Sequence, residues 1–133
     1  MRFVPTIALG LMMALNFARG AIHAFAPDGG AHSIAGLDLS QGSQTILSLF
    51  ALLGFHQLVA GLFQLFVLAF RRDLILLALV LQTLETAFGV VNLYFYRTFP
   101  VMVPGAPFNA AILVGLVLVT AIALRQHFVQ RTA

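Results

Sequence analysis

Residues 58–83 read LVAGLFQLFVLAFRRDLILLALVLQT, two apolar runs separated by the charged tripeptide Arg71-Arg72-Asp73. A helix needs about 20 apolar residues to cross a hydrocarbon layer of about 30 Å, and both runs continue beyond the quoted segment. Charged side chains are costly in hydrocarbon, so the tripeptide has to lie at the membrane surface. This stretch therefore predicts two membrane helices joined by a tight charged turn.

The same apolar pattern recurs on both sides of this segment. We expect four membrane-spanning helices, near residues 3–25, 44–70, 74–96 and 107–126. A polar loop containing several glycines separates the first two. The last connection holds Pro100, Pro104 and Pro107, so it is not expected to form a regular helix. The predicted fold is an all-α integral membrane four-helix bundle, a single transmembrane domain over residues 1–133.

The composition excludes a water-soluble domain. Of 133 residues, 61% are hydrophobic and 8% are charged, whereas a soluble domain needs about a quarter charged to cover its surface. The seven basic residues are all arginines and never cluster beyond two, so nucleic acid is not an expected partner. The chain has no cysteine, which excludes disulfides and thiolate metal sites.

The positions of the arginines predict the orientation, because short positively charged segments stay in the cytoplasm. With four spans, the N-terminus, the charged turn and the C-terminal tail lie on one side of the membrane. That side collects Arg2, Arg71, Arg72, Arg125 and Arg131. We therefore expect both termini to be cytoplasmic. We also expect the first span to be retained, because Pro27 directly follows its cleavage-like Ala24-Phe25-Ala26 sequence.

Polar side chains form one stripe on each of the first three predicted helices. At 100° per residue, each set falls within an arc of about 60° to 100°. Lipid offers these groups no hydrogen bonds, so the stripes are expected to face the bundle interior and form a polar pocket. The predicted ligand-binding residues are Asn16, Arg19, His23, His56, Gln57, Gln82, Glu85 and Asn92, and Gln64 shares the second stripe.

Glu85 is the most informative of these residues, because it lies near the predicted midplane, where an acidic side chain costs about 2.5 to 3.5 kcal/mol. It is either a packing carboxyl bonded to Gln57, His56 or Arg19, or a ligand-binding or proton-handling carboxyl. A third alternative is exposure to lipid. Arg19 lies about 7.5 Å nearer the outer surface. It is either the counter-charge of Glu85 or an arginine that extends to the outer headgroups.

Motifs that would indicate an enzyme are absent: the sequence has no GxGxxG, P-loop, HExxH or nucleophile elbow. No catalytic residue, cofactor or metal site is predicted. His23 and His56 differ in depth by about 15 Å, too far for one haem iron. A metal at His56 and Glu85 would need further ligands at the same level. Five glycines inside the spans are expected to allow close helix approach: Gly10, Gly54, Gly61, Gly89 and Gly115.

Three segments carry a family resemblance: Arg19-Gly20-Ala21-Ile22-His23, the run from Gly54 to Leu62, and the Arg71-Arg72 turn. In these segments the chain resembles the DoxX-like superfamily of small four-span bacterial membrane proteins, many of them domains of unknown function. The resemblance implies a four-helix bundle in the bacterial inner membrane. In some members it also implies a link to quinone-dependent oxidation.

These observations lead to two functional hypotheses and a weaker third. The first is a membrane protein whose polar pocket binds a small amphiphile, a lipid or a quinone. The second is a non-catalytic accessory subunit or homo-oligomer, in which the polar stripes hold helices or subunits together. The third, a proton pathway through Glu85, is the weakest, because conduction usually requires a chain of sites.

Overall fold

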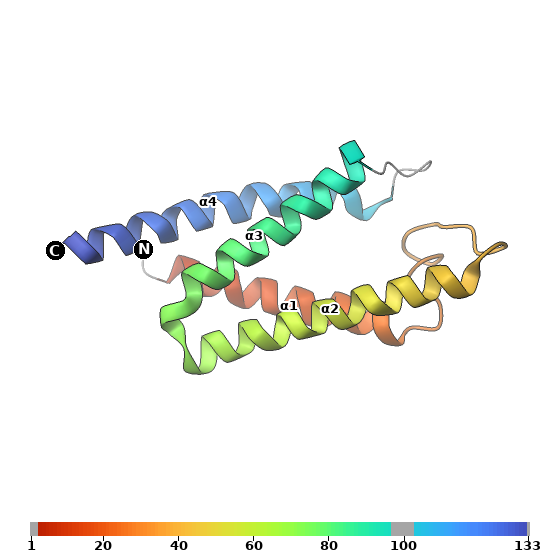
Figure 1. Cartoon of the computed structure of the whole chain (residues 1–133), viewed down its shortest axis with the longest axis horizontal. Coiled ribbons are helices and arrows are strands. Elements are labelled where there is room, and N and C mark those ends of the chain that lie inside the picture. Colours follow the sequence, from red (N-terminus) through yellow and green to blue (C-terminus); the bar gives the residue numbers. More distant parts are fainter. Residues whose placement is uncertain (1–2, 97–102, 133) are drawn as a thin grey trace. The chain divides into compact units, whose positions relative to one another are not determined.

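The computed structural model describes residues 3–96 and 103–132, and side chains to residue 130. It contains four long helices: α1 (Val4–Phe25), α2 (Ser43–Phe70), α3 (Ile75–Val91) and α4 (Gly105–Thr132) (Figure 1). A 3-10 turn, η1 (Arg72–Leu74), precedes α3, and a π-helical turn, η2 (Asn92–Tyr96), follows it. The described residues include no strand, which confirms the all-α prediction.

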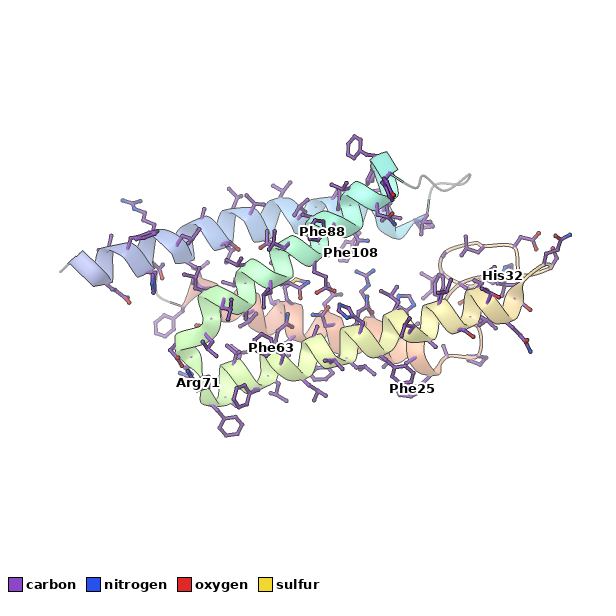
Figure 2. All side chains as sticks on the ribbon, viewed as in Figure 1. Phe25, His32, Phe63, Arg71, Phe88 and Phe108 are labelled. Carbon is purple, nitrogen blue, oxygen red and sulfur yellow. The ribbon has the colours of Figure 1, made fainter. Side chains whose placement is uncertain are left out.

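Four helical segments are long and apolar enough to cross a membrane, one of them α3 together with its two flanking turns. Three of the long helices, α1, α2 and α4, can each cross a membrane without flanking turns. The shortest of them is α1, whose 22 residues extend over about 33 Å. Large apolar side chains such as Phe25, Phe88 and Phe108 are exposed on the helix surfaces (Figure 2). Outward-facing phenylalanines suit lipid as the surrounding solvent, and the fold is that of an integral membrane protein.

The boundaries of α4 differ from the predicted span of residues 107–126. The helix begins at Gly105, so Pro107 lies in its first turn, where the missing N–H group would have had no partner in the helix. At the other end it continues to Thr132, because polar residues such as Arg125 and Gln126 are good helix formers. The prediction of an irregular connection falls partly on residues 97–102, which lie outside the described residues.

The turn between α2 and α3 is the predicted charged turn. The guanidinium of Arg71 donates two hydrogen bonds to the Asp73 carboxylate, at 2.9 and 2.7 Å (Arg71 is labelled in Figure 2). Arg72 Nε donates to the Leu68 carbonyl at 3.2 Å and so satisfies an acceptor in the last turn of α2. All three charged residues are exposed. The charges therefore pair with one another and with the helix end, as a turn at a membrane surface requires.

The chain divides into two compact units. The first, Leu11–Leu65, contains most of α1 and α2 and is called the hairpin unit below. The second, called the α3–α4 unit, comprises Met1–Gly10 and Phe66–Ala133. In the α3–α4 unit, Leu79 of α3 and Leu116 and Ala123 of α4 are among the buried apolar side chains. Spacings of three and four residues put such buried positions on one face of each helix.

Candidate functional site

Two buried amide side chains join α1 to α2 in the hairpin unit. Asn16 Nδ2 donates a hydrogen bond of 3.1 Å to Gln64 Oε1. The side chains are almost completely enclosed, with Asn16 5% and Gln64 2% exposed. Neither group would find a partner in lipid, so the bond fixes the rotation of the two helices about their axes at this level.

Glycines bring the two helix backbones into direct contact. A Cβ atom on Gly20 would lie 2.9 Å from the Gly54 carbonyl oxygen and 3.0 Å from the Leu58 amide nitrogen. A Cβ on Gly54 would collide with the Ala24 amide nitrogen and lie 2.8 Å from the Gly20 carbonyl oxygen. Because the obstructing atoms belong to the backbone, no side-chain movement relieves these contacts. The α1–α2 crossing therefore requires glycine at both positions.

One face of α2 carries both the glycines and the amides. Gly54, Gln57, Gly61 and Gln64 follow at intervals of three and four residues, and all four are buried. Gly54 contacts α1 through Gly20, and a Cβ on Gly61 would lie 3.3 Å from the ring of Phe17. This face of α2 therefore packs on α1 along about three turns.

Gln57 lies between the two glycine contacts of this face and is 6% exposed. Its Oε1 atom is buried and has no hydrogen-bond partner among the described residues. A buried acceptor without a partner costs about 1 to 3 kcal/mol. Gln57 is therefore a polar group whose buried position is not explained by the packing of the hairpin unit.

His23 ties the end of α1 to the following loop. Its Nδ1 lies 2.7 Å from the Gly29 carbonyl oxygen, and a carbonyl only accepts, so Nδ1 carries the donated proton. The ring packs edge-on against Phe50, with 5.3 Å between ring centroids. Gly29 has φ 58°, and a Cβ there would lie 3.1 Å from Phe50 Cβ. His23 therefore stabilises a loop in which glycine is required at position 29. Its contact with a ligand stays a prediction.

The loop is ordered around Asp28. The Asp28 carboxylate accepts hydrogen bonds from the backbone N–H groups of Gly30, at 3.0 Å, and Ser33, at 2.7 Å. These bonds, that from Ser33 first, lower the pKa of Asp28 from 3.8 to about 2. Hydrogen bonds from Ser40 also lower the pKa of Asp38 further along the loop. Both carboxylates are therefore ionised and act as loop acceptors at neutral pH.

In the α3–α4 unit, two threonine hydroxyls connect α3 to α4. Thr83 Oγ1 donates to the Leu79 carbonyl at 2.7 Å and lies 2.9 Å from Thr120 Oγ1. A hydroxyl has one proton, so Thr120 is the donor to Thr83. On α3, Gln82 Nε2 donates to Thr86 Oγ1 at 3.3 Å, and Thr86 Oγ1 donates to the Gln82 carbonyl at 2.8 Å.

Neither Thr83 nor Thr120 was among the residues predicted from the sequence. A signal was present for Thr120, since it and Asn109 are the polar residues between Phe108 and Leu124. Thr83 is adjacent to Gln82 and therefore about 100° away from the predicted stripe. Gln64 lies in the second stripe but was not among the predicted ligand-binding residues. It proves to be the partner of Asn16.

The remaining predicted residues differ in exposure. Arg19 on α1 and Glu85 on α3 are half-buried, whereas His56 on α2 and Asn92 in η2 are exposed. His56 adjoins Gln57 but lies about 100° around the helix, so the buried part of the second stripe is narrower than predicted. The meeting of the three stripes in one pocket stays a prediction.

The glycine prediction is correct at two positions and wrong at three. Gly54 and Gly61 make the close contacts described above. A Cβ on Gly10, Gly89 or Gly115 would meet no neighbouring atom of the described residues within 4 Å. Gly20, whose carbonyl oxygen lies against Gly54, was not among the five glycines predicted to allow close helix approach.

Comparisons with protein-family models, curated proteins and solved structures found no match to this chain. In the described part of the chain, no group of three histidine, aspartate or glutamate side chains could hold a metal ion.

Proposed function

We propose that this protein is a bacterial inner-membrane protein, with cytoplasmic termini, that binds a small amphiphile, a lipid or a quinone through its intramembrane polar side chains. The proposed site is centred on the amide face of the hairpin unit, with Asn16, Gln57 and Gln64. In the α3–α4 unit, Glu85 is proposed to bind the protonatable group of such a ligand. We also propose that the protein is a member of the DoxX-like superfamily, which it resembles in three sequence segments.

The observation that carries the proposal is the buried amide face of α2 within an apolar helix. An amide that serves only to join two helices is expected to have a partner on the other helix, as Gln64 has in Asn16. Gln57, seven residues earlier on the same face, is just as enclosed, yet its Oε1 has no partner among the described residues. Small-molecule sites place a few polar groups in such apolar surroundings. A bound molecule would account for Gln57 where helix packing does not.

Replacement of Glu85 by Gln tests the proposal. Wild-type and Glu85→Gln protein are placed in lipid nanodiscs, and the thermal midpoint is measured with a short-chain quinone and with added phosphatidylglycerol. We expect at least one probe to raise the midpoint of the wild type. The shift should be lost in Glu85→Gln, because an amide can neither ionise nor donate an O–H hydrogen bond to the ligand. Circular dichroism should show that the variant keeps its helices.

Asp38→Asn is the matched control, since it makes the same acid-to-amide change in an exposed loop. It should respond to the probes as the wild type does. An unchanged ligand response in Glu85→Gln contradicts the role of Glu85. The absence of protection by any lipid or quinone contradicts the amphiphile-binding function.

The alternative is a non-catalytic subunit of a membrane complex or a homo-oligomer. The Asn92 side chain in the π-helical turn η2 is exposed. This exposure favours the subunit or homo-oligomer, because an exposed amide on a membrane helix is available to a second chain. Native mass determination after gentle extraction separates the two proposals. A monomer with co-purified lipid supports the ligand site, and a fixed protein stoichiometry supports the subunit.

A further inference from the structure

The unpartnered amide oxygen of Gln57 restricts the chemistry of whatever satisfies it. Gln57 Oε1 is enclosed, and only 6% of the Gln57 surface is exposed. A carbonyl oxygen accepts hydrogen bonds and donates none. Its missing partner must therefore carry an O–H or N–H group.

The hairpin unit does not provide that donor from the neighbouring positions of the amide face. Three and four residues away, Gly54 and Gly61 have no side chain, and they contact backbone atoms of α1 and the ring of Phe17. Asn16, which supplies the buried amide of α1, donates to Gln64. Backbone N–H groups inside a helix are already bonded to carbonyls one turn earlier. Because no residue in the described part of the chain bonds Gln57 Oε1, we expect the donor to come from a bound molecule.

We propose that the amphiphile bound by this protein carries a hydroxyl group and that Gln57 Oε1 accepts a hydrogen bond from it. This inference rests on the proposed function and specifies its ligand. A head group with only ether, ester or ketone oxygens brings a second acceptor toward Gln57 and leaves both oxygens unsatisfied. The glutamine side chain has three rotatable bonds, so its amide can turn toward the ligand while the glycine contacts of α2 stay in place.

A pair of probes that differ only in the donor tests this inference. The probes are 1-dodecanol and its methyl ether, 1-methoxydodecane, each titrated into wild-type protein in lipid nanodiscs at matched membrane mole fraction. Thermal protection is measured as a function of probe concentration. We expect the alcohol to bind about 5-fold more tightly than the ether, which corresponds to the contribution of about 1 kcal/mol from one hydrogen bond.

Gln57→Met removes the acceptor while keeping the length and flexibility of the side chain. The variant should fold, and its preference for the alcohol should fall to about 1-fold. Val59→Met is the matched control, because Val59 lies two residues away on an exposed face of the same helix. It should keep the wild-type preference.

The outcomes separate this inference from the function on which it rests. Equal protection by alcohol and ether in the wild type overturns the hydroxyl assignment and leaves amphiphile binding intact. A preference for the alcohol that persists in Gln57→Met overturns the role of Gln57. Protection by neither probe, together with none by lipid or quinone, contradicts the proposed function itself.

Discussion

The hairpin unit and the α3–α4 unit solve the same problem in different ways. Both hold together apolar helices for which lipid tails provide no hydrophobic driving force. In the hairpin unit, glycines let the backbones of α1 and α2 touch, and an amide bond joins Asn16 to Gln64. In the α3–α4 unit, small and branched apolar side chains pack, and two threonine hydroxyls form a bond between the helices.

The difference concerns how completely each polar group is satisfied. Thr83 and Thr86 each donate to a carbonyl of their own helix and accept a second bond, so neither hydroxyl needs an outside partner. The hairpin unit instead buries an acceptor, on Gln57, that its own packing does not satisfy. A helix pair whose threonine hydroxyls are satisfied in this way is suited to a structural role. The hairpin unit is the better place to look for a ligand.

The largest effect is expected from Gly54→Ala in the hairpin unit. The added methyl group would collide with backbone atoms of Ala24 and Gly20, so the helices would have to separate. We expect a loss of about 3 kcal/mol in the free energy of unfolding, at the upper end for overpacking. Reversible unfolding in bicelles measures it.

Gly115→Ala in α4 is the control for this substitution, because a Cβ there meets open space. Its stability should stay equal or rise by up to about 1 kcal/mol, through the better helix propensity of alanine. Equal effects of the two substitutions would show that the backbone contact does not stabilise the hairpin unit.

The second effect in size is expected from Asn16→Leu. This change leaves the buried Gln64 Oε1 without the bond that Asn16 donates. We expect a loss of about 1 to 2 kcal/mol, larger than a typical interhelical hydrogen bond in membranes, because an acceptor remains buried. A double-mutant cycle with Gln64→Leu measures the coupling, and a coupling near zero would contradict the importance of the bond.

A smaller effect is expected from Thr120→Val in the α3–α4 unit. The side chain keeps its shape and loses the hydroxyl that donates to Thr83. Thr83 remains bonded to the Leu79 carbonyl, so no donor is left without a partner. The expected loss is about 0.6 kcal/mol, measured by the same unfolding assay. A loss greater than that of Asn16→Leu would reverse the comparison between the two units.

The smallest effect is a local dependence on pH in the loop of the hairpin unit. The pKa of Asp28 is lowered from 3.8 to about 2 in the folded loop, so its stabilising bonds are complete above pH about 4. They are lost as the pH falls through about 2. Hydrogen exchange at the amides of Gly30 and Ser33 should become less protected over that range. Asp28→Ala should remove this dependence, and protection unchanged down to pH 2 would contradict it.

Several features of the fold were predictable because they depend on local composition. The charged tripeptide at residues 71–73 forms the expected turn, and the apolar runs form the expected helices. Stripes of polar residues located the buried amides Asn16, Gln57 and Gln82 correctly on their helices. His56 of the second stripe is exposed, since a stripe about 100° wide includes residues that differ widely in exposure.

The amino-acid sequence alone determined that the chain consists of apolar helices suited to a membrane, because hydropathy and helix length add up residue by residue along the chain. Only the tertiary structure decided that Gly20 meets Gly54, that Asn16 bonds to Gln64, and that Gly115 meets open space. These facts depend on the rotation and register of one helix against another. A glycine or an amide acquires its role from the atoms opposite it, and those atoms belong to residues far away in the sequence.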